Sequence, residues 1–318
     1  MRQYERHLVE RPDAEVVALV DLVADRAVAR AREYDLDVPP FADLASALAD
    51  RDANVVCDIT TPEAHLATAS TAMRSGCDVL SEKPMASSLA EVRELGRIAA
   101  EQGRSYAVMQ NRRFLAQVQA ISASLGSDAL GQLGMVNADF YKARNFGGFR
   151  EEMEHVLLMD MAIHTFDQVR FMTGSDATLV GCFEFNPSWS CFRHGSSANA
   201  VFEMSDGIIF SYRGCWCAAG AETPWEATWR FVGERRTLLW DGASTPRMEL
   251  ADGAVAEIPS AYSGSVEHDG ALDEMFAALA VGRPSATAHR EHARSLGMCF
   301  GAEASAQTGQ RVVIEPQL

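Results

Sequence analysis

The chain has 318 residues, which corresponds to about two domains at roughly 150 residues each. Its 47% apolar and 23% charged residues are typical of a folded protein and exclude a disordered one. The formal net charge of −16 disfavours binding to nucleic acid or to an anionic membrane. The apolar stretches are shorter than the ~18 residues that span a bilayer, and the charged start predicts no signal peptide. Seven scattered cysteines predict reduced thiols in a cytoplasmic protein.

The amino-terminal part of the chain alternates predicted strands and helices. Four short apolar runs predict strands, at residues 15–20, 54–59, 78–80 and 106–109. Helices are expected between them, one capped by Thr61 and one opened by the capping-box spacing of Ser88 and Glu91. Continuous apolar strands separated by helices are typical of a parallel sheet, whose ligands bind at the carboxyl ends of its strands. That edge is expected to contain Asp21, residues 60–62 and residues 82–84.

After about residue 115 the pattern changes to a few helices and many strands. Helices are expected at residues 116–124, 159–173 and 271–281. A strand is expected at 135–142, and from residue 177 strands alternate with turns such as Asp206-Gly207. The sequence therefore predicts an α/β fold: a parallel-sheet domain over residues 1–112 and a second domain over residues 113–318, with a large, mostly antiparallel sheet.

Lys83 stands in the tripeptide Glu82-Lys83-Pro84, directly after a predicted strand. At the carboxyl edge of a sheet, its ammonium group could orient a substrate hydroxyl or polarise a carbonyl. The alternative is a surface turn with a solvated lysine, which the tripeptide alone favours.

Asp160 and His164 are four residues apart on a predicted helix and therefore share one face. An imidazole beside a carboxylate can serve as a general base with an orienting partner. The alternative is a buried helix histidine that a neighbouring acid satisfies. Adding His155 would suggest a metal site, but the spacing is unlike that of metal ligands, so we predict none.

Asp21 closes the first predicted strand. In a dinucleotide-binding fold, an acid at this place accepts hydrogen bonds from ribose hydroxyls and repels a 2′-phosphate. Asp21 therefore favours NAD over NADP, and the Leu22 that follows it agrees with this. The alternative is a simple helix cap.

The remaining signals are weaker. Residues 111–114 (NRRF) lie near the expected domain boundary, where they could meet substrate or form a surface arginine pair. Most of the five tryptophans are expected to pack in a core. His289 and His292 are expected on a surface helix, and Cys215 and Cys217 are too close together for a usual zinc site.

Five segments occur in a fixed order along nearly the whole chain. They are EVVALVD (15–21), the stretch from TTPEAHLATAS to SEKPMA (60–86), QNRRF (110–114), LLMDMAIHTFDQVRFMTG (157–174) and GRPSATAHREHARSLG (282–297). In this order they resemble the glucose–fructose oxidoreductase, inositol dehydrogenase and rhizopine-catabolism family, abbreviated Gfo/Idh/MocA. The resemblance implies an amino-terminal Rossmann domain and a carboxyl-terminal α/β domain with an open sheet. It also implies NAD(P)-dependent oxidation or reduction of sugars, inositols or related polyols.

Site residues follow from matching these motifs. The resemblance implies catalytic roles for Lys83, Asp160 and His164. Cofactor contacts are expected from Asp21, Thr60, Thr61, Pro62, His65, Glu82, Lys83 and Asn111. Besides the catalytic residues, substrate contacts are expected from Arg113, Tyr141, Arg144, His155 and Trp189. An open sheet further predicts pairing into a homodimer or homotetramer.

The chain departs from the family pattern at its start. The family begins with a strand and a G-x-G-x-x-G turn that holds the cofactor pyrophosphate. Residues 2–10 already look like the helix after that turn, so about fifteen to twenty residues are expected to be missing. The sheet should then lack its central first strand. Two interpretations remain: the natural protein is longer, which we favour, or this short form binds cofactor poorly.

The leading hypothesis is a dehydrogenase in which His164 moves the hydroxyl proton of a sugar or polyol. Asp160 would orient His164 or a substrate hydroxyl, and Lys83 would align the reacting oxygen. One alternative is a non-catalytic sugar-binding or regulatory protein on the same scaffold. Another is an enzyme that uses tightly held NAD for elimination or glycoside cleavage.

Overall fold

The computed structural model describes residues 2–127, 129–250 and 252–315. These residues form two compact units, each with its own internal contacts. The first unit contains residues 2–111 and 265–292, and the second contains residues 112–264 and 293–315. Each unit is described by itself.

The first unit consists of short strands and the helices that follow them. Its elements are α1 (Arg2–Glu10), β1 (Leu19–Val20), α2 (Ala24–Glu33), β2 (Pro40–Phe41), α3 (Leu44–Asp50), β3 (Val55–Asp58), α4 (Pro62–Arg74), β4 (Asp78–Ser81), α5 (Leu89–Gln102), β5 (Tyr106–Val108) and α9 (Glu267–Ala280). The three later predicted strands are confirmed as β3, β4 and β5, whereas the run 15–20 forms only the two-residue β1. The predicted cap of α5 is also confirmed, because Ser88 Oγ accepts a hydrogen bond from the Glu91 amide.

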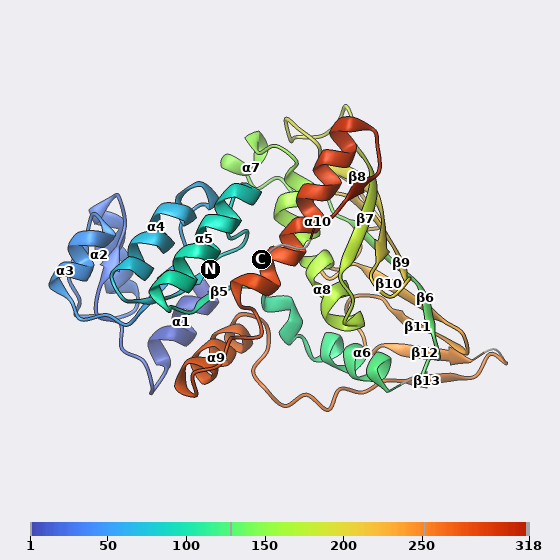
Figure 1. Ribbon diagram of the computed structural model, residues 1–318, viewed down its shortest axis with the longest axis horizontal. Coiled ribbons are helices and arrows are strands. Elements are labelled where there is room, and N and C mark those ends of the chain that lie inside the picture. Colours follow the sequence, from blue (N-terminus) through green and yellow to red (C-terminus); the bar gives the residue numbers. More distant parts are fainter. Residues whose placement is uncertain (1, 128, 251, 316–318) are drawn as a thin grey trace. The chain divides into compact units, whose positions relative to one another are not determined.

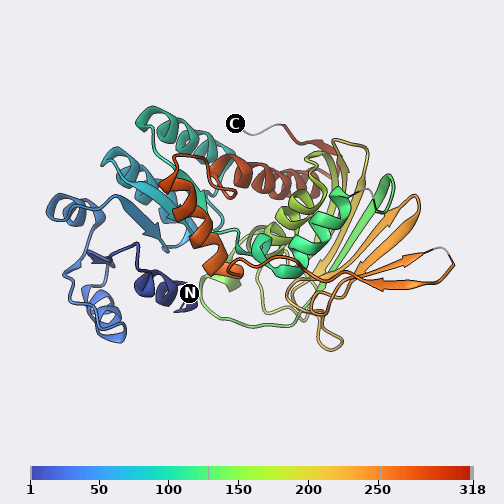
Figure 2. The ribbon, with the colours of Figure 1, turned by 90° about the horizontal axis from the view of Figure 1, so that it is seen from below.

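The strands of the first unit lie in two separate parallel sheets (Figure 2). One sheet pairs β1 with β2, and the other has the order β3-β4-β5. Among the described residues, no strand joins β1 to β3.

Helix α9 requires a correction to the predicted domains, because it belongs to the first unit and not to the second. His7 of α1 contacts Asp273 of α9 at 2.9 Å, and the Arg11 guanidinium lies 4.3 Å from the centre of the Phe276 ring. The chain then continues to the edge of the parallel sheet, where the Val108 amide donates to the Thr287 carbonyl. Sequence patterns are local, so they did not show this return of the chain.

The second unit is a large sheet with helices on one face. Its elements are η1 (Asn111–Phe114, which begins in the first unit), α6 (Ala116–Gly126), β6 (Leu133–Tyr141), α7 (Phe149–Glu152), the π-helical turn η2 (Leu157–Ala162), α8 (Ile163–Thr173), β7 (Ala177–Phe185), β8 (Ser197–Met204), β9 (Ile209–Cys215), β10 (Thr228–Gly233), β11 (Arg236–Trp240), β12 (Arg247–Leu250), β13 (Val255–Glu257), α10 (His289–Thr308, which begins in the first unit) and β14 (Val312–Val313). The predicted hairpin at Asp206-Gly207 is confirmed between β8 and β9.

The nine strands have the order β13-β12-β11-β10-β6-β9-β8-β7-β14. Only the β6–β9 pair is parallel, so the predicted mostly antiparallel sheet is confirmed. Figure 1 shows α6, α8 and α10 on one face of this sheet. Phe166 of α8 packs edge-on against Phe202 of β8 and Tyr212 of β9, at centroid distances of 4.9 and 5.3 Å. Burying each such ring contributes about 1.5–3 kcal/mol, which fixes the helix layer on the sheet.

No helix within the described ranges is both long and apolar enough to cross a bilayer.

Candidate active site

The turn after β4 holds Glu82 and Lys83 at the carboxyl end of the three-stranded sheet. Both side chains are half-buried, and the Glu82 amide donates to the Asp58 carbonyl at 2.8 Å. Burial raises the pKa of the Glu82 carboxyl, and the adjacent Lys83 charge opposes this effect. The backbone thus fixes Lys83 where the sequence analysis expected it, at the ligand-binding edge of a parallel sheet.

His65 lies between the loop that contains Thr60 and the turn that contains Pro84. Its fully buried ring lies 2.8 Å (Nδ1) from the Pro84 carbonyl and 3.1 Å (Nε2) from the Thr60 carbonyl. The ring therefore positions residues 60–62 against the turn that carries Lys83. That His65 also touches the cofactor stays a prediction.

Carboxylates stand at the ends of two strands of the first unit. Asp21, at the end of β1, accepts the Val23 amide on Oδ1 at 2.8 Å, and its Oδ2 has no hydrogen-bond partner among the described residues. Asp58, at the end of β3, is 2% exposed, and its Oδ2 is buried without a partner in the described part of the chain. A buried acceptor without a donor costs roughly 1–3 kcal/mol, which a ligand hydroxyl would relieve. The described residues contain no glycine-rich turn for the pyrophosphate.

In the second unit, Asp160 and His164 are both buried on neighbouring helical turns. The sequence predicts one α-helix over 159–173, but Leu157–Ala162 forms a π-helical turn before α8 begins at Ile163. Asp160 lies in that turn, and His164 lies in the first turn of α8. Local π-helical turns often occur at functional sites, and hydrophobic periodicity alone does not distinguish them from α-helix.

Arg150 is a neighbour of Asp160 that sequence reasoning missed. It lies on the short helix α7, and its Nε donates to Asp160 Oδ2 at 2.7 Å. Its guanidinium stacks 4.7 Å from the Phe149 ring centre and 5.7 Å from that of Phe146. No sequence signal links residues 150 and 160, because the contact depends on how the loop before η2 folds.

Two of the predicted substrate residues, Arg144 and Trp189, lie in loops that join this group, whereas the Tyr141 side chain lies on the open face of the sheet beside Asp139 and Arg213. Arg144 donates to Glu222 at 3.0 Å and lies 5.9 Å from the Trp225 ring, which contacts Phe146 at 6.3 Å. Tyr141 ends β6, three residues before Arg144, and Trp189 donates from its indole to the Cys217 carbonyl at 3.1 Å. Cys217 bridges to Ala143 between them, so loops 141–150, 189–191 and 217–225 meet in one region of the second unit.

Arg113 and His155 pair with acids of the second unit, and their substrate contacts stay predictions. Arg113 forms a buried ion pair with Asp167 through Nε and Nη2, at 2.6 and 2.7 Å. His155 lies 2.5 Å from Glu184 of β7 and 3.5 Å from Glu303 of α10. Arg113 and His155 are each held in position by an acid of the same chain, because a buried charge requires a partner.

The His155–Glu184 pair predicts a pH-dependent stability of the second unit. The hydrogen bond to Glu184 raises the pKa of His155 above 6.5, although burial opposes this. The stabilisation is therefore fully present below 6.5 and is lost as the pH rises through the raised value in the folded protein. We expect urea unfolding, followed by tryptophan fluorescence, to show about 1–3 kcal/mol less stability at about pH 8.5 than at about pH 5.5.

The control uses His155→Gln, which should remove most of this pH step, and His194→Gln, which should leave it in place. All five tryptophans lie within residues 189–240, so the fluorescence reports on the second unit. An identical pH step in His155→Gln and the wild type would contradict the assignment.

Other predicted features have different surroundings from those expected. His292 is fully buried, not on the surface, and lies 2.9 Å from Gln110 and 3.2 Å from the Met85 amide.

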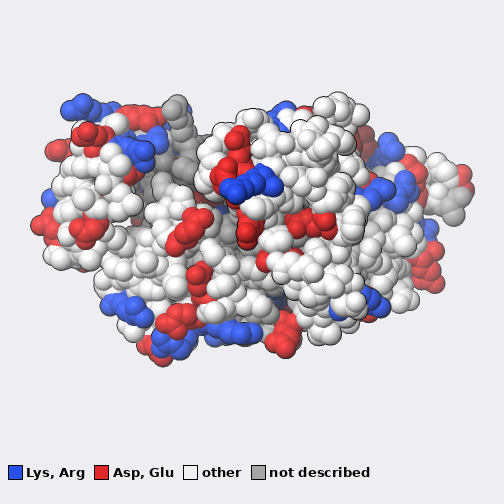
Figure 3. All heavy atoms as spheres, turned by 90° about the horizontal axis from the view of Figure 1, so that it is seen from above, with Lys and Arg blue, Asp and Glu red and all other residues white. Residues whose placement is uncertain are grey.

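In the part of the chain that is described, no group of three or more His, Cys, Asp or Glu side chains could hold a metal ion. On the face shown in Figure 3, acidic and basic side chains are interspersed, so the negative charge is not concentrated there.

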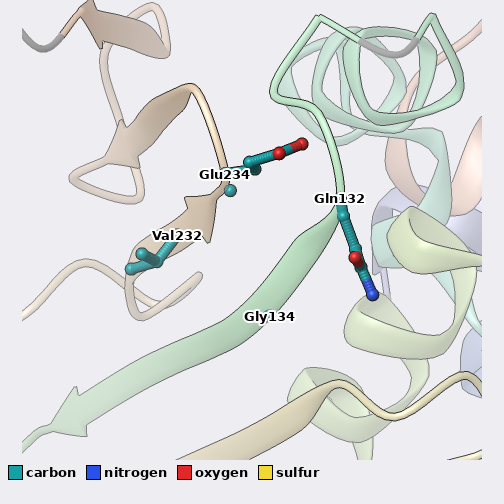
Figure 4. A pocket seen from close by; sticks show the side chains of 5 residues that line it. Gln132, Gly134, Val232 and Glu234 are labelled. Carbon is teal, nitrogen blue, oxygen red and sulfur yellow. The ribbon is translucent and has the colours of Figure 1, made fainter.

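A shallow depression of about 340 Å³ lies at the start of β6, at the opposite end of that strand from Tyr141. Gln132, Val232 and Glu234 line it, and their side chains do not converge on one point (Figure 4). None of the predicted site residues lines it, so it carries no functional argument.

Two models of known protein families match most of the chain. The model described as "Oxidoreductase family, NAD-binding Rossmann fold" matches residues 2–110, and "GFO/IDH/MocA C-terminal domain" matches residues 118–239. The chain belongs to the Gfo/Idh/MocA family of oxidoreductases. The resemblance predicted from the sequence is therefore confirmed, as is the nicotinamide-binding class of its amino-terminal domain.

Relatives in this family act on sugars and polyols. Inositol 2-dehydrogenase 1 of Paenarthrobacter aurescens is 31% identical over 170 residues, which cover 52% of this chain and 49% of that protein. The 1,5-anhydro-D-fructose reductase of Ensifer adhaerens is 23% identical over 325 residues, covering 100% of this chain and 96% of that protein. The chain thus matches about half the length of the inositol dehydrogenase.

A solved structure with the same fold is an oxidoreductase from Agrobacterium radiobacter in complex with NAD+, L-tartaric acid and magnesium. The TM-score is 0.88 at 19% identity, and the match covers 98% of this chain and 94% of that one. At this identity the likeness shows the fold, and the α/β prediction is confirmed.

Proposed function

We propose that this protein catalyses NAD-dependent hydride transfer at a secondary alcohol carbon of a sugar, inositol or related polyol. The observation that carries the proposal is the buried Asp160 and His164 on adjacent turns of one helix, in a chain of this oxidoreductase family. The substrates named for the relatives support the substrate class.

In the oxidation direction, His164 accepts the proton of the substrate hydroxyl, and the carbinol carbon becomes a carbonyl carbon. Asp160 orients the imidazole or a neighbouring substrate hydroxyl and stabilises the imidazolium that forms. Lys83 aligns the reacting oxygen and stabilises negative charge that develops on it. The bound nicotinamide supplies the hydride acceptor, and reduction reverses each step.

The residues proposed to hold the cofactor are those at the strand ends of the first unit: Asp21, Thr60, Thr61, Pro62, His65, Glu82, Lys83 and Asn111. The buried Oδ2 of Asp58, which has no hydrogen-bond partner among the described residues, supports the assignment of ribose binding to these strand ends. We further propose NAD rather than NADP, because a carboxylate at Asp21 would repel a 2′-phosphate.

The proposed oligomer is a homodimer or homotetramer formed through the open sheet, and the proposed location is the cytoplasm. Exposed apolar side chains on that sheet, Phe183, Phe185 and Val201, support pairing.

The test of cofactor choice is calorimetric titration of NAD+ and NADP+ into the purified chain. We expect NAD+ to bind at least about 10-fold more tightly than NADP+. In Asp21→Asn the affinities for the two nucleotides should become more similar. Asparagine retains an oxygen for the Val23 amide, so the local turn remains intact while the charge is removed.

The matched control is Asp25→Asn, which removes an exposed carboxylate of α2 and should leave the ratio unchanged. Equal affinities for the two nucleotides in the wild type would contradict the role of Asp21. If neither nucleotide binds, the non-catalytic sugar-binding alternative is favoured.

A further inference from the structure

Arg150 is the group in this region that the proposed chemistry leaves unused. It follows Gly147 and Gly148, whose positive φ angles of 66° and 73° turn the chain into α7. Its Nε is held on Asp160, and its planar face rests on Phe149. The guanidinium is thereby fixed in position and orientation directly beside the proposed catalytic carboxylate.

The two terminal nitrogens of this guanidinium are available to a ligand. Neither Nη1 nor Nη2 has a hydrogen-bond partner among the described residues, and the side chain is 35% exposed. Four N–H donors therefore remain, arranged in the fork that matches a carboxylate or phosphate bidentately. The other cations near the aromatic rings are engaged, because Lys142 and Arg144 both bind Glu222.

We propose that Arg150 selects substrates that carry a carboxylate, so that the preferred substrate class is the polyhydroxy acids rather than neutral sugars. This rests on the proposed function, since it places the acid group of the substrate next to Asp160. Phe146 and Phe149 are exposed beside the guanidinium and can pack on the C–H groups of such a ligand.

Local charge favours a carboxylate over a phosphate at this place. Asp160 already offsets one unit of positive charge, and Glu151 and Glu152 stand on the same short helix. Glu152 is itself paired with Arg193 at 2.7 Å. A monoanion is therefore accommodated better than a dianion.

The test measures binding of matched acid and neutral ligands by calorimetry, with and without NAD+. The pairs are D-glucuronate against D-glucose and D-gluconate against D-glucitol, and D-glucose 6-phosphate serves as the phosphate probe. We expect each acid to bind the wild type at least about 10-fold more tightly than its neutral partner. Arg150→Met should abolish this preference, and Arg150→Lys should retain only part of it because the fork is lost.

Arg193→Met is the matched control, because it removes an arginine that contacts the same helix through Glu152 and should keep the preference. The proposal is overturned if neutral sugars bind the wild type as tightly as the acids, if Arg150→Met keeps the preference, or if no acid binds. Tighter binding of the phosphate probe, lost in Arg150→Met, would overturn the carboxylate assignment. Acid binding without NADH formation would instead refute the proposed oxidoreduction and leave the role of Arg150 standing.

Discussion

Replacing His164 with asparagine is expected to lower kcat for sugar or polyol oxidation by about 10²–10⁴-fold, the contribution typical of a positioned general base. His164 is buried beside the π-helical turn that carries Asp160, so the imidazole is held where a proton can be passed. The assay follows NADH formation with the most active compound from a panel of inositols, aldoses and sugar acids. Lys83→Ala should cause a comparable loss if Lys83 aligns the reacting oxygen.

The control for His164 is His194→Asn, a histidine in the loop between β7 and β8 that the mechanism does not use. Substrate and NAD+ affinities are measured on each variant, since loss of a base should lower kcat while both ligands still bind. Circular dichroism confirms that the fold is retained. Turnover of His164→Asn within a few-fold of the wild type would show that another group moves the proton.

Much of this site could be predicted because it follows from local patterns. Lys83 follows β4 and Asp21 ends β1, and ligands bind at the carboxyl ends of parallel strands, although these two strands belong to separate sheets. The spacing of Asp160 and His164 predicted that they share one helical face, and the family resemblance supplied their proposed catalytic roles, although Asp160 lies in a π-helical turn. The hairpin at Asp206-Gly207 was visible because that dipeptide favours a tight turn.

The contacts that the sequence patterns did not show all join residues distant in sequence. Arg113 and His155 read as substrate-binding cations, yet each is neutralised by an acid that lies elsewhere in the chain, Asp167 and Glu184 respectively. No sequence pattern singled out Arg150, because its contact with Asp160 depends on the folding of the loop between them. His292 was expected at the surface, but the chain returns to the first unit there and buries it against Gln110. Burial and pairing of charged groups depend on tertiary structure, which periodicity does not encode.

The Arg113–Asp167 pair is expected to contribute strongly to the stability of the second unit. Burial raises the pKa of Asp167, but the charge and hydrogen bonds of Arg113 outweigh this, so the pKa lies below its usual range. Ser295 also donates to Asp167 at 2.8 Å and accepts from Arg170, which completes a buried network. Asp167→Asn removes the carboxylate charge that Arg113 binds in the buried pair and should cost about 3–5 kcal/mol in the free energy of unfolding.

The chain offers a matched control for this cost, because Arg213 and Asp139 form a similar bidentate pair in which the Arg213 side chain is 60% exposed. Asp139→Asn should cost about 1 kcal/mol or less, since water solvates the remaining charge. Urea unfolding followed by tryptophan fluorescence measures both variants on the second unit. The double variant Arg113→Met with Asp167→Leu should recover most of the loss, because it removes both buried charges together. Equal losses for Asp167→Asn and Asp139→Asn would mean that burial of the first pair adds nothing, and that Arg113 is free to serve another role.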